Sequence, residues 1–166
     1  MGTEPGGDTG VAVSRFRRAV WLFPAVFALH VLEEAPGFTR WARRHASDRY
    51  TQTDFIRNNA LGLALTIGGT RLVSRAPGRG SVFLYLSLVR TQQALFNTVF
   101  HVGTTVAYRE YSPGLITAVG GFLPLWLHLS RLAREEGLLG PAGELGAAAI
   151  GGAVHATAVA QQVYKR

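Results

Sequence analysis

The chain has 166 residues, of which 48% are hydrophobic and only 16% are charged. Charged residues make up about a quarter of an ordinary soluble domain, so this composition argues against one, and its apolar content argues against disorder. The formal net charge is +7 and cysteine is absent, which excludes disulfides, thiolate metal sites and cysteine nucleophiles. The length suits one domain. We expect a disordered tail at residues 1–14 and a single helical domain at residues 15–166.

The basic residues are almost all arginine, and they gather at the ends of apolar runs. The clusters are Arg15, Arg17 and Arg18, then Arg40, Arg43, Arg44 and Arg49, then Arg71, Arg75 and Arg79, then Arg131 and Arg134. Basic residues at span ends meet lipid phosphates, and the sequence contains no aromatic-interleaved basic stripe of the kind that binds nucleic acid. The charge therefore indicates membrane lipids as partners and no nucleic acid. The arginine, alanine and glycine bias is typical of a bacterial protein.

Stretches with little or no charge predict five helices, at residues 19–35, 53–74, 81–108, 112–132 and 141–162. About 20 apolar residues of helix cross a bilayer, and a helix satisfies its own backbone hydrogen bonds there. Pro36-Gly37 ends the first helix, and Pro113 opens the fourth. The predicted fold is all-α, an integral membrane bundle of about five transmembrane helices. We expect a multi-pass protein of the inner (cytoplasmic) membrane, and the first basic cluster favours a cytoplasmic N-terminus.

The polar residues of these helices fall at matching depths. The first, third and fifth helices run in one direction, and His30, His101 and His155 come late in them. The second and fourth run the other way, and there Asn58 and Thr117 come early. A helix rises about 1.5 Å per residue, so these positions share one layer in the half of the bilayer nearer the first loop. This layer predicts a buried polar site.

Two adjacent carboxylates, those of Glu33 and Glu34, lie at membrane depth in the first helix. A charged side chain at the centre of a membrane costs about 2.5–3.5 kcal/mol on insertion scales, so the pair indicates a function. Both share a helix face with His30, at spacings of three and four residues. The third helix has a second polar face, formed by Gln93, Asn97 and His101.

Three short motifs resemble those of a known family. His30 to Glu34 reads H-x-x-E-E, Asn97 to His101 reads N-x-x-x-H, and the stretch from Tyr111 to Ala118 follows at the expected distance. Together they resemble the HXXEE domain family, small multi-pass membrane proteins named for the first motif. The resemblance covers most of the chain. It implies this architecture and a polar site, but no reaction, because the function of the family is unassigned.

Imidazoles and carboxylates that converge in a helical bundle are suitable ligands for zinc or iron. The predicted metal ligands are His30, Glu33, Glu34, His101 and His155. The alternative is a structural network in which the two carboxylates pair with Arg40, Arg43 or Arg57.

The sequence thus favours a metal-dependent membrane enzyme that hydrolyses or oxidises a lipophilic small molecule or lipid. The predicted catalytic residues are Glu33, Glu34 and Asn97. The residues expected to contact the substrate or support the ligands are Asn58, Asn59, Gln93, Tyr111 and Thr117. Two alternatives stay open. One is a metal-free isomerase or cyclase that uses the same groups for acid–base chemistry, and the other is a transporter or an accessory membrane subunit.

Overall fold

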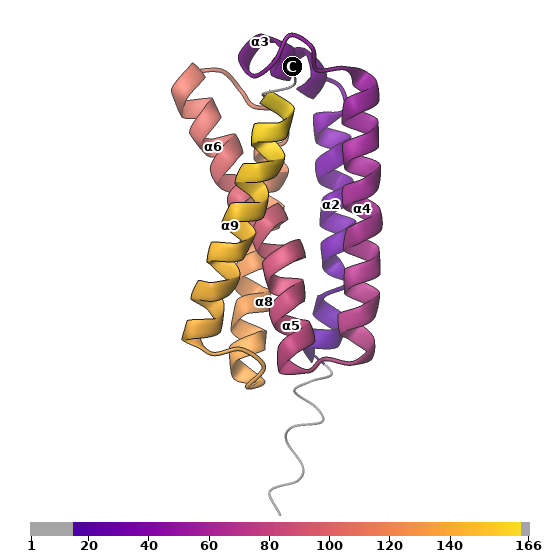
Figure 1. Ribbon diagram of the computed structural model, residues 1–166, viewed down its shortest axis with the longest axis vertical. Helices are drawn as coiled ribbons and strands as arrows, with labels where there is room; N and C mark the ends of the chain where they lie inside the picture. The colour runs from indigo at the N-terminus through magenta and orange to yellow at the C-terminus, as the bar shows by residue number, and fades with distance from the viewer. Residues whose placement is uncertain (1–14, 164–166) are drawn as a thin grey trace, which may run out of the picture.

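The computed structural model describes residues 15–163, with the side chains of residues 90–93 and 162–163 left out of that description. Residues 15–163 form an all-α fold without strands, in which the long helices run side by side (Figure 1). The tail expected at residues 1–14 lies outside the described residues, and so does the side chain of Gln93.

The N-terminal half of the bundle is a helical hairpin closed by a short helix. Its elements are α2 (Leu22–Glu34), α3 (Phe38–His45) and α4 (Gln52–Arg75). The chain is helical from Arg15 and bends by 70° between α2 and α3. Helix α3 therefore lies across one end of the bundle, and α2 and α4 run antiparallel beneath it (Figure 1).

The C-terminal half contains three more long helical sections, two of which include π-helical turns. The third section comprises α5 (Arg79–Tyr85), η1 (Leu86–Phe96) and α6 (Asn97–Tyr108). The fourth comprises α7 (Leu115–Thr117), η2 (Ala118–Phe122) and α8 (Leu123–Glu135), and the fifth is α9 (Pro141–Val163). These sections agree with the expected ranges to within about three residues. The fourth begins at Leu115 and not, as expected, at Pro113, because Gly114 between them has a left-handed backbone with φ of 105°.

Both π-helical segments adjoin residues of the polar layer. Segment η1 ends at Phe96, directly before Asn97, and segment η2 begins directly after Thr117. A π turn has one residue more than an α turn, so it changes the face on which the following side chains project, and such turns are frequent at functional sites. In η2, the carbonyl of Ala118 accepts a hydrogen bond of 3.0 Å from the Thr98 hydroxyl, which ties the two sections together.

A capping box fixes the start of α4. The Thr51 hydroxyl accepts a hydrogen bond of 3.1 Å from the backbone N–H of Asp54, whose carboxylate accepts one of 3.0 Å from the N–H of Thr51. The other carboxylate oxygen of Asp54 accepts from Arg57 at 3.0 Å. These bonds fix the first turn of α4, and Asn58 lies in the turn that follows.

The packed interior consists of two apolar clusters. The larger one lies among α2, the third section and the fourth, where the rings of Phe23 and Phe122 are 5.4 Å apart. The smaller one lies beneath α3 and contains Trp41, Tyr50 and Phe55. Polar side chains of α2 and α6 lie between the clusters.

By length and composition, one helix of the described chain is apolar enough to cross a membrane, namely Leu115–Glu135. A second qualifies if Arg15–Glu34 and Phe38–His45 form one broken span. The buried core helix of a soluble protein passes the same test, so this result is weak evidence for a membrane protein, and it does not establish five spans.

Candidate functional site

Three buried side chains converge between the two apolar clusters: His30 and Glu34 of α2, and His101 of α6. One ligand atom from each lies within 4.8 Å of the others. The Glu34 Oε1 atom is 3.4 Å from His30 Nε2 and 3.5 Å from His101 Nε2. Neighbouring ligand atoms around tetrahedral zinc lie about 3.3 Å apart, because each bond is about 2.0–2.1 Å long. The spacing of this trio therefore fits a metal ion.

The trio is held by aromatic packing on both sides. The His30 ring packs on Phe122 with centroids 4.9 Å apart, and the His101 ring lies 5.2 Å from Phe100 and 6.4 Å from Phe38. The two imidazoles meet edge to face at 5.0 Å. Because the rings cannot turn freely, their inner nitrogens stay directed at Glu34.

The hydrogen bonds of His30 determine which of its nitrogens carries the proton. Its Nδ1 lies 2.8 Å from the hydroxyl of Thr117, which in turn donates to the carboxylate of Glu33. A hydroxyl has a single hydrogen, so His30 Nδ1 donates and the neutral ring has a lone pair on Nε2. The amide nitrogen of Asn97 donates to this Nε2 at 2.8 Å. The inner nitrogen of His30 is thus an acceptor, and its single lone pair can bind a metal ion only in place of the bond from Asn97.

His101 has a similar outer contact and an unsatisfied inner nitrogen. Its Nδ1 lies 2.9 Å from the Ser112 hydroxyl, whereas its fully buried Nε2 has no hydrogen-bond partner among the described residues. Metal-bound histidines are usually held in this way by their second nitrogen. The inner nitrogens of His30 and His101 and the carboxylate of Glu34 face one point, and each of these groups can bind a metal ion.

Glu33 faces away from the trio and binds the segment that leads into α7. Its carboxylate accepts hydrogen bonds from the backbone N–H groups of Ile116 at 2.9 Å and Thr117 at 2.7 Å, and from the hydroxyls of Thr117 and Tyr111. Burial, followed by the bond to Glu33, raises the pKa of Tyr111 to about 12, so the phenol stays protonated and donates. Glu33 thereby fixes Thr117, which holds His30.

Gly114 is a site residue that the sequence analysis did not single out. Its φ is +105°, and a Cβ atom there would lie 2.6 Å from His30 Cε1 and 2.7 Å from His101 Cε1. The backbone of Gly114 therefore covers both imidazoles at a distance that no other residue permits. The signal available in the sequence was its position after Ser112 and Pro113, within a turn that opens a helix.

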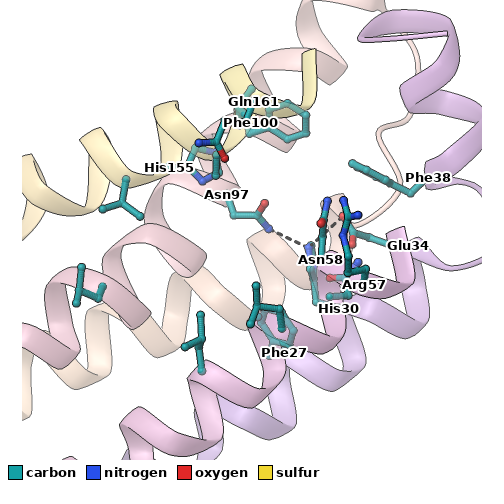
Figure 2. A pocket seen from close by; sticks show the side chains of 18 of the residues that line it. Phe27, His30, Glu34, Phe38, Arg57, Asn58, Asn97, Phe100, His155 and Gln161 are labelled. Carbon is teal, nitrogen blue, oxygen red and sulfur yellow. Dashed lines mark hydrogen bonds and ion pairs between the residues drawn. The ribbon is translucent and has the colours of Figure 1, made fainter. Parts of the chain in front are cut away.

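A pocket of about 500 Å³ adjoins the trio, and His30, Glu34 and Asn97 line it (Figure 2). Asn58 and Asn59, expected near the substrate, also line it. A further lining residue is Tyr50, which the sequence analysis named in no role. Its burial, followed by the charge of Glu34, raises its pKa to about 12.

His155 lines the opposite wall of the pocket, on α9 (Figure 2). Its ring stacks on Phe96, with centroids 6.3 Å apart. Of the five expected ligands, the structure thus brings together His30, Glu34 and His101, and it leaves Glu33 and His155 outside the trio. Two of the three arginines offered as alternative partners of the two carboxylates bond elsewhere: Arg57 to Asp54, and Arg43 to the carbonyl of Asp48.

A family model described as "Protein of unknown function with HXXEE motif" matches residues 21–129. The chain belongs to this HXXEE family. The motif that gives the family its name supplies two members of the trio, His30 and Glu34, together with the anchor Glu33. The matched range also includes His101 and Gly114, whereas His155 lies beyond it. No curated protein and no solved structure matches the chain.

Proposed function

We propose that this HXXEE protein is a membrane-embedded, metal-dependent enzyme that hydrolyses or oxidises a lipophilic small molecule or lipid. The observation that carries the proposal is the convergence of the three ligand atoms of the trio on one buried point.

The donor set of the trio supports zinc or iron. Two histidines and one carboxylate form the ligand set of many catalytic zinc sites and of the non-haem iron oxygenases, and both leave coordination positions open for reactants. A bound ion of this kind supplies Lewis acidity and activates water or dioxygen. Asn97 lies beside His30 and lines the pocket, where its amide can orient a substrate. In this proposal Glu34 is a ligand and Glu33 is a positioning residue.

The exterior supports a membrane location. Each of the five helical sections directs a large apolar side chain outward, with an exposed fraction of 69–74%: Leu32, Leu72, Val106, Ile116 and Leu145. Lipid favours such a surface, whereas water does not. The polar site residues lower the mean hydropathy of their helices but point inward, so we propose that all five sections cross the inner membrane, with the N-terminus in the cytoplasm.

Metal analysis of the detergent-purified full chain tests the proposal. We expect about one zinc or iron ion per chain and, after removal with a chelator, saturable rebinding at a single site. His101→Asn should abolish this rebinding, because it removes a buried ligand. His128→Asn is the matched control, because His128 is exposed and belongs to a different helix. Absence of stoichiometric binding in the unmodified chain would overturn the proposal and favour acid–base chemistry without metal.

Glu33→Gln should weaken metal binding while every ligand remains. The amide places an N–H₂ group where the carboxylate accepts four hydrogen bonds, so Thr117 and then His30 lose their fixed orientation. Loss of such an outer partner typically costs 10–100-fold in affinity, so we expect a loss of about that size.

Calorimetric titration with Zn²⁺ measures the Glu33→Gln effect. The control is Glu135→Gln, which changes an exposed carboxylate paired with Arg15 and Arg131. Equal affinities of Glu33→Gln and the unmodified chain would show that Glu33 does not position the site.

A further inference from the structure

The pocket beside the trio changes from polar to apolar along α4. Arg57 and Asn58 line one end, and Leu61 and Leu65 line the remainder. From Arg57 to Leu65 the helix rises about 12 Å. The wall that α4 contributes can therefore contact a polar group near the first loop and a hydrocarbon chain below it.

Two other walls of the pocket have the same order. On α2, Glu34 and His30 lie at the polar end and Phe27 lies deeper. In the third section, Asn97 lies near the trio and Leu88 lies toward the other end. Helices α2 and α4 run antiparallel (Figure 1), so the polar lining residues come late in α2 and early in α4, yet they lie at the same end of the pocket. On these three walls the polar residues lie at the end near the trio, whereas α9 places His155 beside Val154.

The apolar end of the pocket is open on the side of the bundle. Leu61 and Leu65 of α4 and Val154 of α9 line the pocket, yet their exposed fractions are 59%, 60% and 38%. Helices α4 and α9 form two facing walls of the pocket, and Figure 2 shows lining side chains that extend from both helices. In a membrane, this opening meets lipid chains rather than water.

The polar end offers a cation and an amide. Arg57 lies with Asn58 beside Glu34 and His30 (Figure 2), and its side chain is 63% exposed. Its bond to Asp54 holds it in place, and a guanidinium has five N–H donors, more than one carboxylate takes up. An oxyanion at this end therefore finds donors already positioned.

From these features we infer that the pocket binds a single-chain amphiphile with an oxyanion head group, a carboxylate or a phosphate. The head group lies beside Arg57 and Asn58, next to the trio, and the chain lies along Leu61, Leu65 and Val154. The molecule enters from the bilayer between α4 and α9. This inference rests on the proposed function, since it names the substrate class of the same site.

Photolabelling tests the inference on the full chain in lipid nanodiscs. The probe is an oleate with a diazirine in the middle of its chain, and the labelled residues are mapped by mass spectrometry. We expect labels on α4 between Leu61 and Leu65 and on α9 between Val154 and Val159. Ala158→Trp fills the pocket and should remove these labels, whereas Ala156→Trp, on the outer surface of the same helix, should not. Uniform labelling of the exterior that Ala158→Trp does not change would overturn the inference.

A second variant protects the test against misfolding. Leu65→Trp changes a pocket residue that is 60% exposed, and Leu72→Trp changes a residue of α4 outside the pocket that is 70% exposed. Only Leu65→Trp should abolish photolabelling of the pocket.

Competition identifies the head group. Unlabelled oleate or oleoyl lysophosphatidate should displace the probe about tenfold better than oleyl alcohol, the gain expected from a charge-assisted hydrogen bond. The better of the two acids shows whether a carboxylate or a phosphate is preferred. Equal displacement by the alcohol would overturn the assignment of an oxyanion.

Labelling before and after chelation separates this inference from the proposed function. Pocket labels on a chain that binds no metal would refute the metal-dependent enzyme and retain the amphiphile site. A metal-loaded chain without pocket labels would retain the metal site and refute the amphiphile.

Discussion

Gly114→Ala is expected to eliminate metal binding, although it leaves the three proposed ligands His30, Glu34 and His101 unchanged. The new Cβ atom would lie within 3 Å of both imidazoles, a separation that Cβ atoms essentially never have. Its φ of +105° adds backbone strain, which costs about 1–3 kcal/mol for a residue other than glycine. The rings of His30 and His101 are buried against aromatic side chains, so they can move aside only by separating from Glu34.

The Gly114→Ala effect is measured by Zn²⁺ titration together with the melting temperature. Gly103→Ala is the control, because Gly103 lies inside α6 and a Cβ atom there meets nothing within 4 Å. In a helix interior, alanine stabilises by about 0.5–1 kcal/mol relative to glycine, so the control should melt slightly higher and bind metal normally. Normal metal affinity in Gly114→Ala would contradict the described contact between Gly114 and the imidazoles.

Glu34→Gln is expected to have opposite effects on metal binding and on the stability of the metal-free chain. The carboxylate is buried, and it faces the inner nitrogens of His30 and His101. The amide of glutamine can donate to the Nε2 atom of His101, which has no hydrogen-bond partner among the described residues, whereas the carboxylate can only accept. We therefore expect the metal-free variant to be more stable by about 1–3 kcal/mol, the usual cost of an unsatisfied buried polar group. Its metal affinity should fall by more than the 10–100-fold typical of an outer partner.

Thermal unfolding with and without Zn²⁺ separates the two effects of Glu34→Gln. Zn²⁺ at a concentration 1,000 times its Kd should raise the free energy of unfolding of the unmodified chain by about 4 kcal/mol. The variant should show no such increase. Glu110→Gln serves as the control, since its exposed carboxylate pairs with Arg44 and His45 at the surface. If metal stabilised Glu34→Gln as much as the unmodified chain, Glu34 would not be a ligand.

The sequence by itself determined the helical sections and the existence of a polar site. The apolar runs and the Pro-Gly breaks placed the ends of most helices, because helix formation and termination depend on local residues. The spacing of His30 and Glu34 put both on one helix face, and that of Asn97 and His101 did the same in α6, since one turn relates each pair. The HXXEE resemblance marked the same residues.

Only the tertiary structure decided which polar residues act together. Glu33 and Glu34 are neighbours in sequence, but they point about 100° apart around the helix, so one meets the histidines and the other meets the start of α7. His155 lies at the depth expected for a ligand, yet α9 packs so that its ring stacks on Phe96 across the pocket. The role of Gly114 depends on two rings from α2 and α6 meeting one turn of backbone. Such contacts depend on how helices pack against each other, which the spacing within a single helix does not specify.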